Sequence, residues 1–91
     1  MSIKVNIFFP QLLQAMHDPE IVTVDGTTVG ECLKDLIRQY PAAERLIFNA
    51  QGQIQRQLNV FVNAESLRKT ELTKPVREGD TLIIAILIGG G

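Results

Sequence analysis

The sequence predicts an α+β fold in which a mixed β-sheet carries one main helix packed on one of its faces. Three observations lead to this prediction. Segments near both ends of the chain alternate between apolar and polar residues, with the period of two that is typical of half-buried strands. Between them lies a segment with helical periodicity and a helix-start motif. The last strand-like segment is apolar on both faces, as expected for a central strand.

The composition describes one small domain. The chain has 91 residues and a mass of 10.1 kDa, of which 45% are hydrophobic and 21% charged. A second core would need roughly 50 or more further residues. We therefore expect a single domain over residues 1–88, followed by a flexible glycine tail at residues 89–91.

Charge and hydropathy exclude several classes of function. Nine Lys plus Arg and ten Asp plus Glu leave a net charge of -1, whereas nucleic-acid binders need an excess of cations. The longest apolar run, residues 82–88, is far shorter than the roughly 20 residues that cross a bilayer. A single cysteine and an N-terminal segment unlike a signal peptide fit a reducing cytoplasm. We expect no nucleic-acid partner, no membrane span and a cytoplasmic location.

Two strands are expected at the start of the chain. Residues 3–9 alternate in hydropathy and end at Pro10, which predicts the first strand. Residues 11–20 are interpreted as a connection. The β-branched run at residues 21–24 predicts a second strand, because such side chains fit a pleated surface. The two strands suggest a hairpin with a long loop.

The main helix is expected at residues 29–40. Thr28 and Glu31 have the spacing of a capping box, in which each side chain accepts a hydrogen bond from the other residue's backbone N–H. Pro41 disfavours helical backbone at the residue before it and ends the helix. One further short turn is compatible with residues 41–48. The apolar stripe that faces the sheet contains Val29, Leu33, Leu36, Ile37 and Tyr40.

Three further segments complete the expected sheet. Alternation returns at residues 54–62 and predicts a third strand. Residues 63–71 are interpreted as a polar connection, and residues 72–76 as a short edge strand. An uninterrupted strand is expected at residues 81–88. Because it is apolar on both faces, either the centre of the sheet or a partner covers its outer face.

The sequence gives little indication of catalytic or metal-binding residues. His17 is the only histidine and lies in a connection without a neighbouring nucleophile, so we interpret it as a solvated side chain. Cys32 lies on the apolar helix stripe and is expected to pack in the core as an inert thiol. No Cys and His spacing is typical of a zinc site, and no glycine-rich loop precedes the helix. We expect no catalytic residue, no metal site and no cofactor bound by this chain.

The C-terminal glycines are the exception. Gly89, Gly90 and Gly91 directly follow the last expected strand, so an ordered element delivers a chain end that has no side chains. Three extended residues reach roughly 10 Å, and such a tail fits a narrow channel. A carboxylate is a poor electrophile, so acyl chemistry at Gly91 needs activation, for example as a mixed anhydride with AMP. Composition alone leaves a frayed chain end as the alternative.

The order of the elements and three motifs resemble a known family. The Glu78-Gly79-Asp80-Thr81-Leu82 turn leads into the last strand, and the chain ends in Gly90-Gly91. The Leu58-Asn59-Val60-Phe61-Val62-Asn63 segment resembles the third-strand signature of carriers for molybdopterin and cysteine synthesis. Over essentially its whole length the chain resembles the ubiquitin-like β-grasp sulfur carriers. The implied fold is therefore a ubiquitin-like β-grasp.

The sequence departs from the pattern of that family at two places. Family members often carry proline before the tail, where this chain has Ala85-Ile86-Leu87-Ile88, and the small residue that usually precedes the diglycine is here a third glycine. The first departure concerns the contacts with partners. The second leaves open whether Gly91 or Gly90 is the reacting end. Thiamine-type carriers tend to lack material corresponding to residues 41–57, so the molybdopterin and cysteine branches are nearer.

The resemblance implies a protein co-substrate and not an enzyme. A partner similar to the ubiquitin-activating E1 enzyme would adenylate the Gly91 carboxylate with ATP and magnesium. The same partner would recognise the tail of this chain through Gly89 and Gly90. Sulfur transfer would then form a thiocarboxylate. A sulfur-accepting synthase subunit of molybdopterin or cysteine biosynthesis would receive the sulfur. Two alternatives stay open: a ubiquitin-like modifier that Gly91 joins to lysines, and a non-covalent interaction module.

Strand parity predicts an apolar patch on the face of the sheet opposite the helix. The strand residues expected to face the helix are Ile3, Val5, Val60, Val62, Leu82 and Ile84. The apolar residues on the open face are then Phe8, Phe61, Ile83 and Ala85. Contiguous exposed apolar surface marks interaction sites, and an aromatic residue at its centre contributes most. We expect these four residues to contact the partner proteins, with Phe61 as the anchor.

Overall fold

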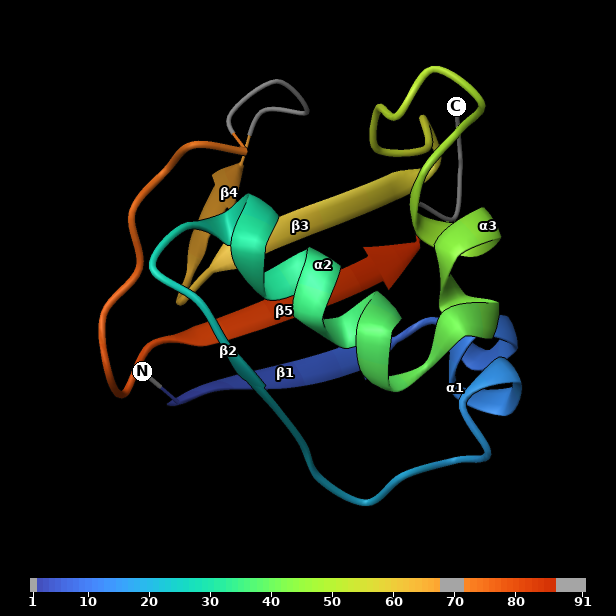
Figure 1. Cartoon of the computed structure of the whole chain (residues 1–91), viewed down its shortest axis with the longest axis horizontal. Coiled ribbons are helices and arrows are strands. Elements are labelled where there is room, and N and C mark those ends of the chain that lie inside the picture. The colour runs from blue at the N-terminus through green and yellow to red at the C-terminus, as the bar shows by residue number, and fades with distance from the viewer. Residues whose placement is uncertain (1, 68–71, 87–91) are drawn as a thin grey trace.

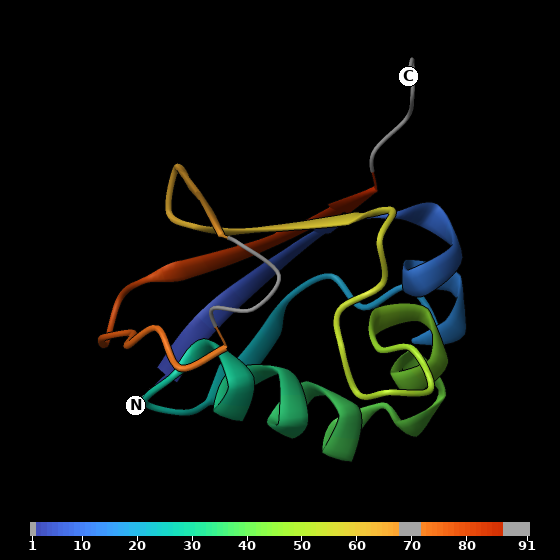
Figure 2. The ribbon, with the colours of Figure 1, turned by 90° about the horizontal axis from the view of Figure 1, so that it is seen from above.

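The computed structural model describes residues 2–67 and 72–86, which form two layers. A five-stranded sheet makes one layer, and the main helix α2 packs across one of its faces (Figures 1 and 2). The shorter helices lie at the end of the sheet where β5 ends (Figure 2). The elements follow the chain as β1 (Ser2–Phe8), α1 (Pro10–Ala15), β2 (Val22–Asp25), α2 (Val29–Gln39), a 3-10 turn (Pro41–Ala43), α3 (Glu44–Ile47), β3 (Leu58–Val62), β4 (Glu65–Leu67) and β5 (Thr81–Ile86).

The strands are arranged in the order β2-β1-β5-β3-β4. β1 runs parallel to β5, and the other neighbouring pairs are antiparallel. β5 therefore lies in the centre, with Ile84 opposite both Ile7 of β1 and Val60 of β3. This arrangement confirms the predicted α+β class with a mixed sheet. Because strands flank β5 on both sides, its outward residues Ile83 and Ala85 are half-buried among neighbouring side chains.

The core lies between the sheet and α2. Val29, Cys32, Leu33 and Leu36 of the helix are fully buried. The six strand residues that parity assigns to the helix side are all buried: Ile3, Val5, Val60, Val62, Leu82 and Ile84. The predicted faces of these three strands are therefore confirmed. Burial of this apolar surface is the main favourable contribution to folding.

The helix start differs in detail from the predicted capping box. Thr28 Oγ1 accepts from the Glu31 N–H at 3.2 Å, as expected. Glu31 Oε1, however, accepts from both the N–H and the hydroxyl of Thr27, each at 2.8 Å. The hydrogen bond from the Thr27 N–H is the main reason why the pKa of Glu31 lies below its usual value.

The interpretation of residues 11–20 as a connection is wrong in its first half, because residues 10–15 form α1. Pro10 occupies the first turn of this helix, where its missing N–H costs nothing. Leu12 and Met16 are buried beneath it. Pro10 thus does two things, because it ends β1 and begins α1.

The predictions for the second half of the sheet need three corrections. The supposed polar connection contains β4, which forms a hairpin with β3. The supposed edge strand at residues 72–76 is no strand, and only Pro75 makes an isolated bridge, to Thr28. The third strand begins at Leu58, because the preceding segment turns away and Ile54 bridges to Phe48 instead. The expected continuation of the last strand to residue 88 lies outside the described residues.

Candidate functional site: the open sheet face beside the end of β5

Three neighbouring strands place the predicted patch residues together. Phe8 of β1 lies opposite Ala85 of β5, and Ile83 of β5 lies opposite Phe61 of β3. Side chains of paired residues lie on the same face of a sheet, so the four form one group of neighbours. We call Phe8, Phe61, Ile83 and Ala85 the apolar patch. It unites residues from both ends of the chain.

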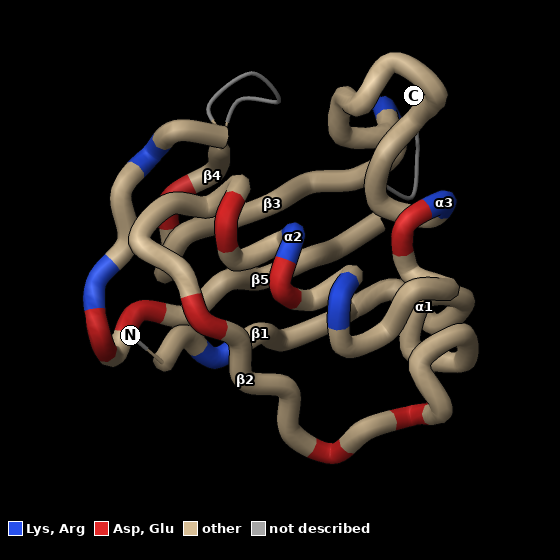
Figure 3. The backbone as a smooth tube through the Cα atoms, viewed as in Figure 1, with Lys and Arg blue, Asp and Glu red and all other residues tan. Residues whose placement is uncertain are grey.

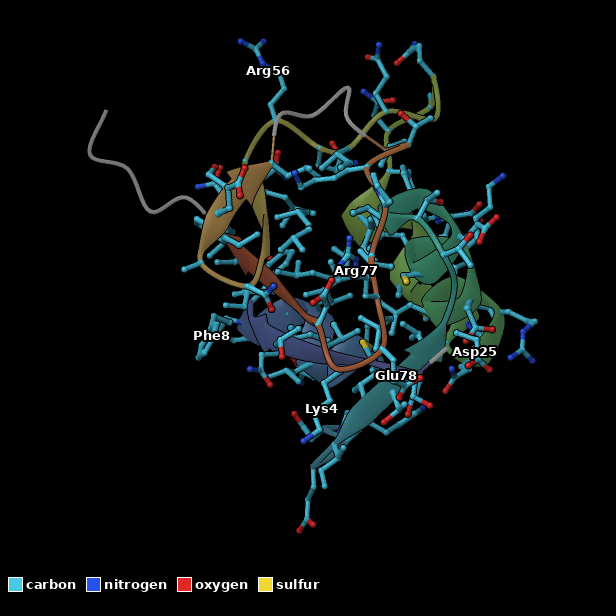
Figure 4. All side chains as sticks on the ribbon, turned by 90° about the vertical axis from the view of Figure 1, so that its left-hand side faces the viewer. Lys4, Phe8, Asp25, Arg56, Arg77 and Glu78 are labelled. Carbon is cyan, nitrogen blue, oxygen red and sulfur yellow. The ribbon has the colours of Figure 1, made fainter. Side chains whose placement is uncertain are left out.

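The patch faces away from the helix layer, and its members differ in exposure. Phe8 is 63% exposed and projects from the sheet on the side away from α2 (Figure 4). Phe61, Ile83 and Ala85 are half-buried. Phe8 and not Phe61 therefore offers the largest free apolar surface. The structure places all four residues where parity puts them, and their contact with partner proteins stays a prediction.

The surroundings of the patch carry few charges. β3 and β5 contain no charged residue, and charges lie mainly on the helices and loops (Figure 3). Lys4 lies four residues before Phe8 on β1, at the opposite end of the open face, where it pairs with Thr81. The apolar end of the face is therefore the end at which β5 finishes.

A shallow hollow beside the patch was missed by sequence reasoning. It has a volume of about 630 Å³ and lies between α1 and the end of β5. Its lining is apolar except for one carboxylate, that of Asp18. The apolar lining residues are Ile7, Phe8, Phe9, Pro10, Leu13, Ala85 and Ile86. The missed signal was Pro10 before Leu12, Leu13 and Met16, which is a short helix start and not only a strand end.

The last described residue, Ile86, lines this hollow, and only residues 87 and 88 separate it in sequence from the three glycines. Gly89, Gly90 and Gly91, the residues predicted to be recognised and to react, lie outside the described residues. The described part of the chain ends at Ile86, which lies at the apolar end of the open face.

A polar link between β3 and β5 fixes the start of β5. Asn63, at the end of β3, accepts through Oδ1 from the Thr81 N–H at 3.0 Å and donates its own N–H to the Thr81 carbonyl at 2.7 Å. Its Nδ2 donates to Asp80 Oδ1 at 3.3 Å. The Arg77 N–H, bound to Asp80 at 2.9 Å, is the main cause that lowers the pKa of Asp80. The two family-like motifs thus meet here and set the register of β5.

Asn63 has two roles, because its side chain makes hydrogen bonds and its backbone adopts a left-handed conformation, and two substitutions separate these roles. Its φ of 56° lies in the left-handed region, which asparagine and glycine tolerate better than alanine. Asn63→Gly removes only the side-chain hydrogen bonds, whereas Asn63→Ala also strains the backbone. We expect Asn63→Ala to lower the free energy of unfolding by about 1 kcal/mol more than Asn63→Gly. Urea unfolding followed by circular dichroism measures the difference, and equal losses would contradict the backbone argument.

Cys32 and His17 are the two side chains of the described part of the chain that the sequence analysis considered for catalysis. Cys32 is fully buried, and burial raises the pKa of its thiol to about 11, so the thiol is protonated at neutral pH. The predicted packing of Cys32 in the core is confirmed. His17 is exposed in the loop after α1. Residues 2–67 and 72–86 contain no group of three His, Cys, Asp or Glu side chains that could hold a metal ion.

The helices are short. Within the described ranges, no helix has the length and apolar character that crossing a membrane requires.

A larger hollow, of about 760 Å³, lies between α2, α3 and the loop that follows α3. Lys34, Glu44 and Arg45 give its lining a mixed charge, and the four patch residues do not contribute to it. The apolar patch is therefore the stronger candidate for a functional surface.

Comparison with known proteins identifies the family that this chain resembles. The sequence model of the ThiS family matches residues 7–91. Small archaeal modifier protein 1 of Haloferax volcanii is 35% identical over 71 residues, which are 77% of this chain and 78% of that protein.

Two solved structures show the same fold over nearly the whole chain. The crystal structure of SAMP1 from Haloferax volcanii has a TM-score of 0.84 and 28% identity, and the match covers 100% of both chains. A chain of the Amycolatopsis orientalis BexX/CysO complex has a TM-score of 0.80 and 28% identity, with 98% of this chain and 99% of that chain covered. The mixed sheet and its helix layer are therefore those of a ubiquitin-like β-grasp.

Proposed function

The chain belongs to the ThiS family of ubiquitin-like β-grasp proteins, and we propose that it acts as a sulfur carrier. The observation that carries this proposal is the arrangement at the end of β5. The central strand leaves the core at the apolar end of the open face, a few residues before Gly90-Gly91. A partner that binds the patch can therefore take up the chain end that follows.

The proposed chemistry takes place at the carboxylate of Gly91. An E1-like enzyme with ATP and magnesium joins this carboxylate to AMP and releases pyrophosphate. A sulfide-equivalent nucleophile then attacks the acyl carbon and AMP leaves, so that a thiocarboxylate remains on Gly91. This chain supplies recognition and a held chain end, while the catalytic groups and the nucleotide belong to the partner.

The mass of the intact protein tests the proposal. The purified chain is incubated with the E1-like enzyme of the same organism, ATP, magnesium and a sulfur donor. We expect a mass gain that equals the exchange of one oxygen for one sulfur, and omission of ATP is the control. The starting mass establishes that Gly91 is the last residue. An unchanged mass with a folded carrier and an enzyme that is active on ATP would contradict the proposal.

The acceptor of the sulfur is proposed to be a synthase subunit of cysteine or molybdopterin biosynthesis. The structural similarity to a chain of the BexX/CysO complex, at 28% identity, supports a protein partner for this chain. The two pathways differ in the acceptor, so the purified thiocarboxylate is offered to each type of subunit in turn. Loss of the extra sulfur mass with one acceptor and not with the other identifies the pathway. The proposed setting is the cytoplasm, where ATP is available and thiols stay reduced.

A second candidate function is that of a ubiquitin-like modifier. The specific observation in its favour is the name of the relative that is 35% identical, a small archaeal modifier protein. In this case the ε-amino group of a lysine attacks the adenylated Gly91, AMP leaves, and an isopeptide bond forms.

The modifier function has its own signature in mass spectrometry. The last Lys or Arg before the glycines is Arg77, so trypsin would leave residues 78–91 attached to a modified lysine. An Ile88→Arg variant would shorten this remnant to Gly89, Gly90 and Gly91. Branched peptides of that mass on cellular proteins would support conjugation. Their absence from cells in which the thiocarboxylate is abundant would count against it.

Two exposed side chains provide a matched test of the patch. Phe8 is 63% and Ile21 76% exposed, and only Phe8 belongs to the patch. A central aromatic contact at an interface contributes on the order of 2 kcal/mol, so we expect Phe8→Ser to lower kcat/KM for adenylation about thirtyfold. Ile21→Ser should leave it within about twofold. Measuring adenylate formation at several carrier concentrations gives both values, and equal losses would show that the patch is not the contact surface.

A further inference from the structure

β2 forms one edge of the sheet, and edge strands present N–H and C=O groups to which another strand can pair. Natural proteins protect such edges with charges, bulges or a covering element. In this structure two backbone groups of the β2 edge are hydrogen-bonded to side chains of α2. These contacts have no part in the proposed sulfur chemistry, because they lie on the helix side of the molecule.

The contacts form a closed set of three hydrogen bonds. Asp35 Oδ2 accepts from the Asp25 N–H at 3.0 Å. Gln39 Nε2 donates to the Thr23 carbonyl at 3.0 Å. Gln39 Nε2 also donates to Asp35 Oδ2 at 3.0 Å. Asp35 and Gln39 are four residues apart on α2, so they lie on the same face of the helix.

This set reproduces the hydrogen bonds of a parallel strand. In a parallel ladder, a residue opposite Val24 donates its N–H to the carbonyl of residue 23 and accepts from the N–H of residue 25. The Gln39 amide supplies that donor, and the Asp35 carboxylate supplies that acceptor. The two side chains therefore occupy the position that one residue of an added strand would take.

The acceptor is held from its other side. Asp35 Oδ1 accepts from Arg38 Nε at 2.8 Å and from Arg38 Nη2 at 2.6 Å. The Asp35 side chain is only 13% exposed. The Asp25 N–H is the main cause that lowers the pKa of Asp35, and Arg38 adds to the effect, so the carboxylate is ionised at neutral pH. We call Asp35, Arg38 and Gln39 the edge clasp.

We propose that the edge clasp closes β2 to strand addition and so prevents two copies of this chain from pairing through β2. The excluded occupant is the β2 strand of a second copy, in antiparallel orientation. Two identical edges related by a two-fold axis are self-complementary, because each offers the Asp25 N–H and the Thr23 carbonyl to the other. Ile21, which is 76% exposed just before β2, would be covered by such pairing.

Sedimentation velocity of the purified chain tests the proposal. The wild type is expected to be monomeric up to several hundred micromolar. Asp35→Ala combined with Gln39→Ala is expected to produce a dimer whose share rises with concentration. Asp35→Asn is the matched control: its amide oxygen keeps the Asp25 N–H as donor while the Arg38 side chain, which is 71% exposed, turns to solvent, and the variant is expected to stay monomeric. Ile21→Lys added to the double variant is expected to reverse association, because it places a charge on the paired edge.

A folded double variant that stays monomeric over the same range would overturn the proposal. Amide hydrogen exchange gives a second test, which needs no association and applies even if the double variant does not fold. The Asp25 amide is expected to exchange at least about tenfold faster in Asp35→Ala than in the wild type, because this variant removes its acceptor. Alanine favours the helix, so Asp35→Ala is expected to fold. Gln39→Ala keeps the Asp35 acceptor and is the matched control. An unchanged exchange rate in Asp35→Ala would show that the clasp does not close the edge. Neither readout depends on sulfur transfer.

Discussion

Removal of Gly90 and Gly91 is expected to abolish both adenylation and the gain of sulfur, while the unfolding transition stays unchanged. The reacting carboxylate would then stand on Gly89, two residues nearer to the sheet. Two extended residues span roughly 7 Å, so the shortened chain end no longer reaches the nucleotide of a partner docked on the patch. Intact mass and ATP–pyrophosphate exchange measure the loss.

Two further variants sharpen this prediction. Removal of Gly91 alone leaves a diglycine at residues 89 and 90 that is one residue shorter in reach, and sulfur gain in this variant would show that Gly90 can react. Gly89→Ala keeps the length of the tail and is expected to stay active, because it adds only one methyl group to the chain end. A double deletion that preserves the cellular function would support a non-covalent module and contradict both tail mechanisms.

Ile84→Ala is expected to lower the free energy of unfolding by about 2–5 kcal/mol. Ile84 is fully buried on the central strand, between Ile7 and Val60. Alanine leaves a cavity there that neighbouring strands cannot close, since their backbones are fixed by hydrogen bonds. The loss is a large share of the 5–15 kcal/mol that is usual for a domain. Urea unfolding followed by far-ultraviolet circular dichroism measures it.

Ile83→Ala is the matched control for this prediction. It removes the same atoms one residue earlier, on the open face, where Ile83 is only half-buried opposite Phe61. We expect a loss of stability below about 1 kcal/mol. The same variant is expected to weaken activation by the partner, whereas Ile84→Ala is expected to leave activation of the folded protein unchanged. Two variants with equal losses of stability would contradict the assignment of the two faces.

The faces of the strands and of α2 could be predicted from the sequence because they depend on local periods. Alternation assigned Ile84 to the core and Ile83 to the open face, and the helix stripe assigned Cys32 to the core. Both assignments agree with the burial in the structure. The elements that were mispredicted have weak local signals. α1 has six residues and β4 three, so each contains fewer than two full periods and its pattern does not repeat.

The candidate site, too, has one part that could be predicted from the sequence and one part that could not. Its four patch residues were predicted by parity, and the hollow beside them was not, because it needs α1 and β5, which are far apart in sequence. The edge clasp had no signal at all. In the sequence, Asp35 and Gln39 are ordinary polar residues of an amphipathic helix, and only the packing of α2 against β2 gives them a common partner.

The sequence by itself determined which residues of each strand are apolar on which face, where the main helix begins, and that three glycines follow the central strand. These features follow from periods and motifs within a few residues. Only the tertiary structure decided which strands are neighbours, that Phe8 is the most exposed residue of the patch, and that α2 closes the β2 edge. The physical reason is that strand order and register are set by contacts between distant segments, which no local pattern encodes.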